Sequence, residues 1–247
     1  FIGLDKKVIV NGKGRIVPIN FDNAATTPAF KRVLKKVLET SEYYGSIARG
    51  DGQKSQYCSD LYEECRNYVL KYFNAPVEKY TAIFVSNTTD GLNKLSNILI
   101  EKSDDIVITT RMEHHSNDLP WRNKCNLKYV ETDEKGRVKM DELEELLNKY
   151  NGQVKLVTVT GASNVTGYIN DIKKIAKLTH RCGGKIIVDG AQLVPHKKVS
   201  MISDDCEENI DFLVYSAHKI YAPFGSGAIV GLKDSFNKLE PDIKGGG

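Results

Sequence analysis

From residue 80 onward, short apolar segments alternate with amphipathic helical patterns, and this alternation constrains the fold more than any other feature of the chain. The expected strands are residues 81–86, 105–109, 127–131, 154–160, 185–189, 212–215 and 228–230, and the expected helices are 92–100, 141–150 and 172–181. Strands that alternate with helices form a mainly parallel sheet covered by helices on both faces. We therefore predict an α/β fold whose functional side chains lie in loops at the carboxyl ends of the strands.

The first 80 residues are less regular. We interpret residues 1–20 as an N-terminal lead-in with a hairpin around Asn11-Gly12, and residues 21–247 as one large domain. Two helices are expected, at 29–42 and 58–73, and the Gly- and Ser-rich segment 43–55 between them is expected to be a loop. The small and hydroxyl residues of 21–28 indicate either a turn that packs against another part of the chain or an ordinary helix start.

Composition excludes several classes of protein. The 247 residues carry a net charge of +3 with acidic and basic residues interspersed, which does not predict a nucleic-acid surface. There is no apolar run of membrane-spanning length and no signal-peptide pattern, so no membrane is expected. The five cysteines include no CxxC pair, which argues against a disulfide framework or a zinc site and favours a reducing cytoplasm.

The stretch from Asp211 to Gly227 holds the most reactive candidate. An apolar strand ends there in Ser-Ala-His-Lys, and a Pro- and Gly-rich loop follows. Lys219 is therefore placed just beyond a strand end, where a lysine can form an imine with a carbonyl cofactor. The alternative is a surface lysine, the ordinary expectation in a lysine-rich chain.

Other strand ends carry side chains of compatible chemistry. Thr88 and Thr89 lie in the turn 87–91 before a helix, which predicts either an anion site or an ordinary N-cap. His114, beside His115, is a candidate for stacking on an aromatic ring, for metal binding or for a structural role, although adjacent histidines point in different directions and no ligand partner stands at metal-binding spacing.

Asp189 ends an apolar strand, where a carboxylate is costly unless it is paired. A protonated pyridine nitrogen would be a suitable partner, and an N-cap or a structural ion pair is the alternative. A phosphate cradle, a stacking imidazole, a carboxylate for a ring nitrogen and an imine lysine together match the needs of pyridoxal 5'-phosphate.

These motifs resemble those of the class V aminotransferase family, the fold type I pyridoxal-phosphate enzymes. Within it the chain is most similar to the cysteine desulfurases and selenocysteine lyases of the Suf/Csd type. The resemblance covers residues 21–247 and is carried by four segments in order: 112–117 (Met-Glu-His-His-Ser-Asn), 163–167 (Ser-Asn-Val-Thr-Gly), 188–192 (Val-Asp-Gly-Ala-Gln) and 216–219 (Ser-Ala-His-Lys).

The resemblance implies a role for each candidate. Lys219 would hold the cofactor covalently and later move the α-proton of the substrate, and Asp189 would pair with the pyridine nitrogen. The remaining cofactor-binding residues would be His114 on the ring face, Thr88, Thr89, Ser216 and His218 at the phosphate, Gln192 at the phenolic oxygen and Asn164 near the ring and the substrate carboxylate.

The chain departs from the family pattern in three places. The loop around Arg49 lacks the histidines that usually surround it, and Asn87 and Asp90 replace the usual Gly and Glu of the phosphate turn. The resemblance also implies a small C-terminal domain that is missing from this chain, with a carboxylate-binding arginine and a nucleophilic cysteine beyond Gly247. None of the five cysteines matches that cysteine.

The activity implied by the resemblance is removal of sulfur or selenium from cysteine or selenocysteine, which leaves alanine. A homodimer is also implied, with the Arg49 loop and the segment from Gly245 near the partner's site, and a sulfur-acceptor protein is a candidate partner. The alternatives are another member of the family (a transaminase, an epimerase or a kynureninase-like enzyme) or a non-catalytic scaffold homologue.

Overall fold

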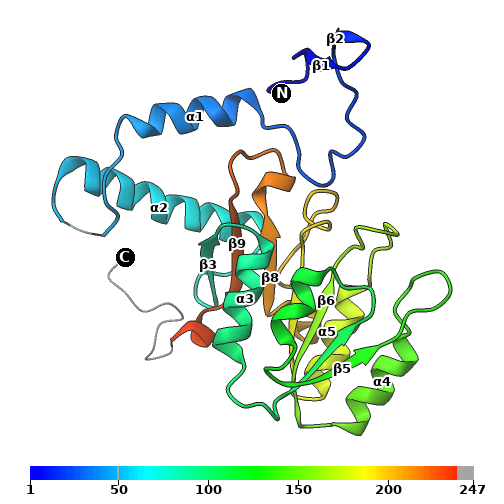
Figure 1. Cartoon of the computed structure of the whole chain (residues 1–247). Coiled ribbons are helices and arrows are strands. Elements are labelled where there is room, and N and C mark those ends of the chain that lie inside the picture. The colour runs from blue at the N-terminus through cyan, green and yellow to red at the C-terminus, as the bar shows by residue number, and fades with distance from the viewer. Residues whose placement is uncertain (49, 238–247) are drawn as a thin grey trace.

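The computed structural model describes residues 1–48 and 50–237 (Figure 1). Its strands are β1 (Val8–Val10), β2 (Gly14–Ile16), β3 (Tyr80–Val85), β4 (Ile106–Thr110), β5 (Asn126–Val130), β6 (Val154–Thr160), β7 (Lys185–Asp189), β8 (Phe212–Ser216) and β9 (Gly227–Leu232). Its α-helices are α1 (Lys31–Ser41), α2 (Gln53–Tyr72), α3 (Thr88–Leu99), α4 (Met140–Lys149) and α5 (Ile172–Arg181). The expected α/β fold is therefore confirmed.

The central sheet has seven strands in the order β3-β9-β8-β7-β6-β4-β5. β8, β7, β6, β4 and β5 are parallel to one another. β9 is antiparallel to both of its neighbours, β3 and β8, so β3 runs in the same direction as the parallel strands. Every strand of this sheet except β9 consequently has its carboxyl end at the same edge.

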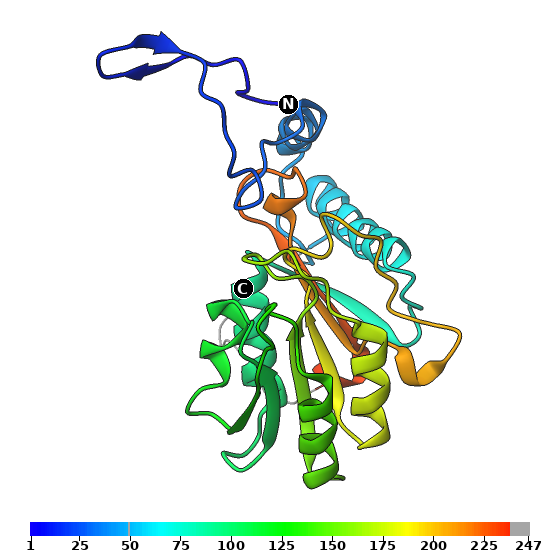
Figure 2. The same cartoon turned by 90° about the vertical axis from the view of Figure 1, so that its right-hand side faces the viewer.

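Helices cover both faces of the sheet, as the alternating pattern predicts (Figure 2). Leucines of α3 pack with Trp121 against one face, and apolar residues of α2, α4 and α5 form the core on the other face. β4 and β8 are buried along their whole length, because both of their faces are covered. This packing makes the sheet a rigid platform for the loops at its edge.

The boundaries of two elements, α2 and α3, differ from the expectation by more than two residues. Residues 87–91 are not a free turn: α3 starts at Thr88, because the Asn87 side chain accepts a hydrogen bond from the Asp90 N–H and caps the helix. α2 starts at Gln53, so the end of the expected loop 43–55 is helical. Gly45 lies against the backbone of Lys54, where a Cβ atom would approach to 2.8 Å. Arg49 lies outside the described residues.

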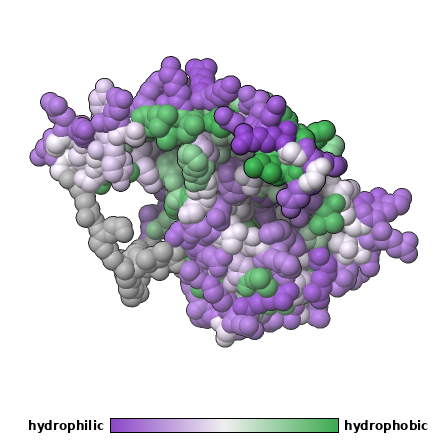
Figure 3. Space-filling view, turned by 45° about the horizontal axis from the view of Figure 1, so that its top comes forward, coloured by the Kyte–Doolittle hydropathy of each residue, from purple (hydrophilic) through white to green (hydrophobic). Residues whose placement is uncertain are grey.

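The N-terminal part projects from the sheet (Figures 1 and 2). β1 and β2 form the expected antiparallel hairpin around Asn11-Gly12. α1 has no buried residue, and Val37 and Leu38 on it are exposed. Figure 3 shows patches of apolar surface (green) among polar residues in the upper part of the view. No helix of the described residues is long and apolar enough to cross a membrane.

A hydrogen-bonded histidine–aspartate pair joins α5 to the sheet at the edge opposite the loops. His180, in the last turn of α5, places Nε2 2.8 Å from Oδ2 of Asp211 and Nδ1 2.6 Å from the carbonyl oxygen of Glu207. Asp211 also accepts a hydrogen bond from the Ile186 N–H of β7. The hydrogen bond to Asp211 is the main cause that raises the pKa of His180, and burial acts against it.

The stability of the fold should therefore depend on the charge of His180. Because the pKa of folded His180 lies above that of the unfolded chain, this stabilisation is complete below the unfolded pKa and is lost as pH rises through the folded pKa. We expect His180→Gln to lower the free energy of unfolding by roughly 1–3 kcal/mol at about pH 5 and by less at about pH 9.

Urea unfolding at both pH values measures this difference, with His196→Gln as the control because His196 is exposed. A loss of stability that is the same at both pH values would show that the His180 charge contributes nothing.

Candidate active site

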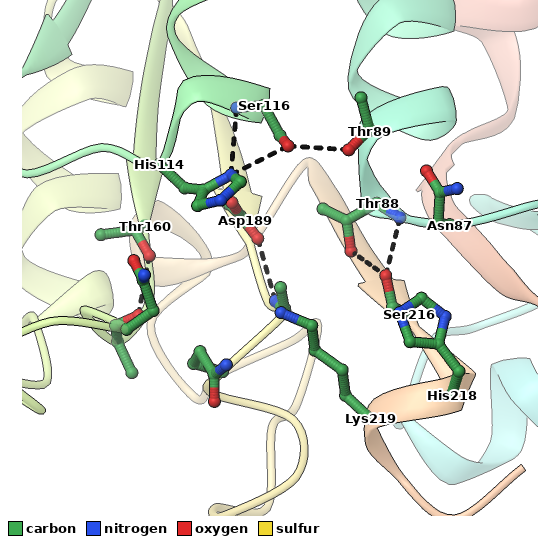
Figure 4. A pocket seen from close by; sticks show the side chains of 14 residues that line it. Asn87, Thr88, Thr89, His114, Ser116, Thr160, Asp189, Ser216, His218 and Lys219 are labelled. Carbon is green, nitrogen blue, oxygen red and sulfur yellow. Dashed lines mark hydrogen bonds between the residues drawn. The ribbon is translucent and has the colours of Figure 1, made fainter. Parts of the chain in front are cut away.

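A cavity of about 220 Å³ lies at the carboxyl edge of the sheet (Figure 4). Every candidate from the sequence lines it: Thr88, Thr89, His114, Asn164, Asp189, Gln192, Ser216, His218 and Lys219. These residues are spread over positions 88–219, and they meet because β3, β4, β6, β7 and β8 end at one edge. Their roles toward a cofactor remain predictions.

One end of the cavity is formed by hydroxyl groups at the start of α3. The N–H of Thr88 donates to Ser216 Oγ at 2.8 Å, and the Thr88 and Ser216 hydroxyls are also 2.8 Å apart. Thr89 Oγ1 lies 2.7 Å from Ser116 Oγ. Gly91 allows this close approach, because a Cβ atom there would lie 2.4 Å from a methyl group of Val214. The helix N-terminus and these hydroxyls together favour an anion.

His114 lies in the loop after β4, directly before the short helix η1 (His115–Asn117). Its Nδ1 accepts a hydrogen bond from the Ser116 N–H at 3.1 Å and is 2.9 Å from Ser116 Oγ. Ser116 thus joins the imidazole to Thr89 (Figure 4). No group of three or more His, Cys, Asp or Glu side chains in residues 1–48 and 50–237 is arranged to hold a metal ion.

Asp189 lies at the floor of the cavity and is only 3% exposed. Its Oδ1 accepts a hydrogen bond from the Ala191 N–H at 2.9 Å. Burial raises the pKa of this carboxyl, although the Ala191 N–H and the charges of His114 and Lys219 act in the opposite direction. A buried carboxylate with so few partners is suited to pairing with a cationic group of a ligand.

Lys219 ends the short helix η4 (Ala217–Lys219), which follows β8 immediately. Beside it, His218 has a buried Nδ1 without a hydrogen-bond partner among the described residues. Burial and the neighbouring Lys219 lower the pKa of His218, so a neutral imidazole is favoured. His218 lines the same cavity as Thr88 and Ser216, so the three polar side chains are available to one ligand there.

Glu113 is a residue that the sequence reasoning missed. Its carboxyl accepts hydrogen bonds of 2.6 Å from Thr110 Oγ1 and from Asn117 Nδ2, and it also interacts with the backbone of Thr160. It therefore links β4, η1 and β6 beneath the His114 loop. Burial is the main cause that raises the pKa of Glu113 to about 8. No local sequence pattern predicts that the Glu113 carboxyl is buried, although Glu113 belongs to the 112–117 motif that carries the family resemblance.

The cavity also contains residues that were not assigned a role: Asn87, Ser116, Thr160, Ala162 and Ala191. The position of Thr160 at the end of an expected strand was the signal that could have found it. The turn 21–28 packs against this site. This contact favours the interpretation of these residues as a turn that packs against another part of the chain over that of an ordinary helix start. Gln192 Nε2 donates to the carbonyl oxygen of Ala24 at 3.1 Å, so in this structure its amide is bonded to the turn.

Comparison with known proteins decides the family. Residues 19–247 match the sequence model of the family described as aminotransferase class-V. The chain belongs to the class-V aminotransferase family. The resemblance and the fold expected from the motifs are thereby confirmed.

Curated relatives of this class-V aminotransferase chain are named cysteine desulfurases or probable cysteine desulfurases. A cysteine desulfurase of Wigglesworthia glossinidia brevipalpis is 34% identical over 93% of this chain and 56% of that protein. A probable cysteine desulfurase of Synechocystis sp. is 35% identical over 92% of this chain and 54% of that protein. The chain therefore spans about half the length of the curated relatives it matches.

Solved structures agree with these relatives. The cysteine desulfurase of Thermococcus onnurineus superimposes with a TM-score of 0.80 at 32% identity, over 92% of this chain and 56% of that one. A NifS-like protein of Rickettsia africae gives a TM-score of 0.79 at 25% identity, over 91% of this chain and 60% of that one. The class-V fold thus holds over nearly the whole length of this chain.

Proposed function

We propose that the protein containing this chain is a pyridoxal-phosphate-dependent cysteine desulfurase, which removes sulfur from cysteine, or selenium from selenocysteine, and leaves alanine. The observation that carries the proposal is that Lys219 and Asp189 line one cavity at the strand ends of a chain similar to cysteine desulfurases. A reducing cytoplasm is the proposed setting, in keeping with five free cysteines.

The residues present fit the cofactor. Thr88, Thr89 and Ser216 would hold its phosphate at the N-terminus of α3, and His218 lines the same cavity. Asp189 would accept a hydrogen bond from the pyridine nitrogen and hold the proton on that atom. Its burial favours such a partner, because the Ala191 N–H and the charges of His114 and Lys219 offset only part of the cost of burying the ionised carboxylate.

The chain's own residues then have separate tasks. The Lys219 amine would bind the aldehyde carbon of the cofactor and afterwards take and return the proton at the substrate Cα. The His114 ring, fixed through Ser116, would cover the face of the pyridine and exclude water. When bound, the cofactor supplies an electron sink for the negative charge that develops at Cα. Asn164 and Gln192 would orient the substrate and the cofactor at the cavity rim.

The sulfur must leave to a thiolate of the protein. In that step the substrate C–S bond breaks, an S–S bond forms on the protein, and the β-carbon gains a proton to give alanine. None of the five cysteines of this chain lines the cavity. We propose that the accepting thiol is the cysteine implied by the family resemblance, and that an acceptor protein takes the sulfur from it.

A homodimer is part of the proposal. The exposed apolar residues along α1 and in the N-terminal segment support it, because monomeric proteins rarely expose contiguous apolar surface. The contributions expected from Arg49 and from the segment at Gly245 lie outside the described residues. Light scattering of the full-length protein measures its oligomeric state. A monomer with full activity would contradict the proposal of a homodimer.

The decisive experiment supplies cysteine and a reductant to the full-length protein loaded with pyridoxal phosphate. We expect alanine and sulfide in equal amounts, because the sulfur is transferred and the amino group stays on the product. Formation of a keto acid would indicate a transaminase, and racemised substrate would indicate an epimerase. Absence of both a lysine-bound absorbance band and any product would indicate a scaffold homologue.

A further inference from the structure

The turn 21–28 contacts the lysine turn, defined here as residues 217–222, on both sides of Lys219. The N–H and the Oγ1 hydroxyl of Thr27 each donate to the carbonyl oxygen of His218 at 3.0 Å. The same hydroxyl oxygen accepts a hydrogen bond of 2.7 Å from the Tyr221 N–H. One hydroxyl group thus joins the backbone before Lys219 to the backbone after it.

The lysine turn needs such support. η4 is a single turn, and its carbonyl acceptor Ala217 O is shared by the N–H groups of Ile220 and Ala222. Tyr221 has a φ of 67°, a left-handed conformation that is unfavourable for a residue with a large side chain. The Tyr221 N–H donates to Thr27 Oγ1 and not to a carbonyl oxygen of the lysine turn.

Neighbouring contacts hold Thr27 in turn. The Phe30 N–H donates to the Tyr221 carbonyl oxygen at 3.1 Å, and the Phe30 and Tyr221 rings lie 4.8 Å apart between centroids. On the other side of Thr27, Gln192 donates to the carbonyl oxygen of Ala24. Contacts on both sides of Thr27 therefore hold it in place.

We propose that Thr27 is a positioning residue whose hydroxyl holds the lysine turn in the conformation that presents Lys219 to the cavity. The proposal rests on the proposed function for the role of Lys219, but the hydroxyl bridge itself can be tested without cofactor. Thr27 touches neither the cavity nor the reacting atoms; it acts through the backbone of His218 and Tyr221.

The test compares Thr27→Val, which removes the hydroxyl at nearly constant shape, with Thr27→Ser, which keeps it. Thr26→Val is the matched control, because the exposed Thr26 hydroxyl donates only to Ala25 O next to it. Hydrogen exchange of the full-length protein without cofactor measures the protection of residues 217–222. We expect exchange at Tyr221 to rise roughly tenfold in Thr27→Val and to stay at the wild-type rate in the other two variants.

A second measurement follows attachment of pyridoxal phosphate to Lys219 and the pH at which the lysine-bound absorbance band titrates. We expect Thr27→Val to slow attachment by roughly tenfold and to shift that titration, and Thr27→Ser to restore both. Unchanged exchange in Thr27→Val, or changes that serine does not restore, would overturn the proposal. If wild-type protein attaches no cofactor, the proposed function fails, while the exchange result still decides the hydroxyl bridge.

Discussion

Lys219→Ala is expected to abolish covalent attachment of pyridoxal phosphate and to reduce sulfide release from cysteine by roughly 10²–10⁴-fold or more. The reason is the position of Lys219 at the end of η4, inside the cavity that also contains Asp189 and the hydroxyl groups of the α3 terminus. Alanine removes both the amine that would bind the cofactor and the base that would move the Cα proton.

Borohydride reduction followed by peptide mass mapping checks the assignment, because reduction makes the lysine–cofactor bond permanent. In wild-type protein the label should lie on the peptide that contains Lys219, and the variant should carry none. Lys197→Ala is the control, since Lys197 is exposed in the loop after β7 and lies outside the cavity. A label on a different lysine of the wild-type protein would remove Lys219 from the proposed mechanism.

Asp189→Asn should bind the cofactor but lower turnover by roughly 10²–10³-fold. An amide can still accept the hydrogen bond from the Ala191 N–H, so the loop geometry is retained. It has no charge with which to hold a proton on the pyridine nitrogen. Sulfide release and the cofactor absorbance spectrum measure the two effects separately, with the exposed Asp141→Asn as control. Normal turnover in Asp189→Asn would contradict the assigned role.

The same variant has a second expected effect that does not require the cofactor. Because burial raises the pKa of folded Asp189 above its unfolded value, its contribution to stability falls as pH rises from the unfolded pKa toward the folded one. The cofactor-free Asn variant avoids this penalty. Its melting temperature should therefore exceed that of cofactor-free wild type at neutral pH, and the difference should shrink at about pH 4.

The strands and the residues at their ends could be predicted because each carries its own local signal. Residues 185–189 form an apolar run that stops at a carboxylate, and residues 212–215 form one that stops at Ser-Ala-His-Lys. Functional side chains of a parallel sheet lie at the carboxyl ends of its strands, so Asp189, Ser216 and Lys219 could be expected to lie close together. The family resemblance added Asn164 and Gln192, for which no pattern in the chain itself argued.

The features that could not be predicted depend on contacts distant in sequence. The Gln192 amide binds Ala24, 168 positions away, and the Thr27 hydroxyl binds backbone groups 191 and 194 positions away. The burial of Glu113 is set by β6 and η1 together, not by its neighbours in the motif. The antiparallel direction of β9 could not be predicted either, because a short apolar run has the same sequence pattern in a parallel and in an antiparallel strand.

The place of β9 in the sheet has a consequence for how the protein is made. Among the described strands, β9 is the only one that pairs with β3, and it separates β3 from β8. A nascent chain that has not yet emerged from the ribosome as far as Leu232 cannot join β3 to the sheet, although β3 was synthesised almost 150 residues earlier. α3 packs across β8 and β9, so the phosphate end of the cavity cannot be completed before β9 has been synthesised and has paired with β3 and β8.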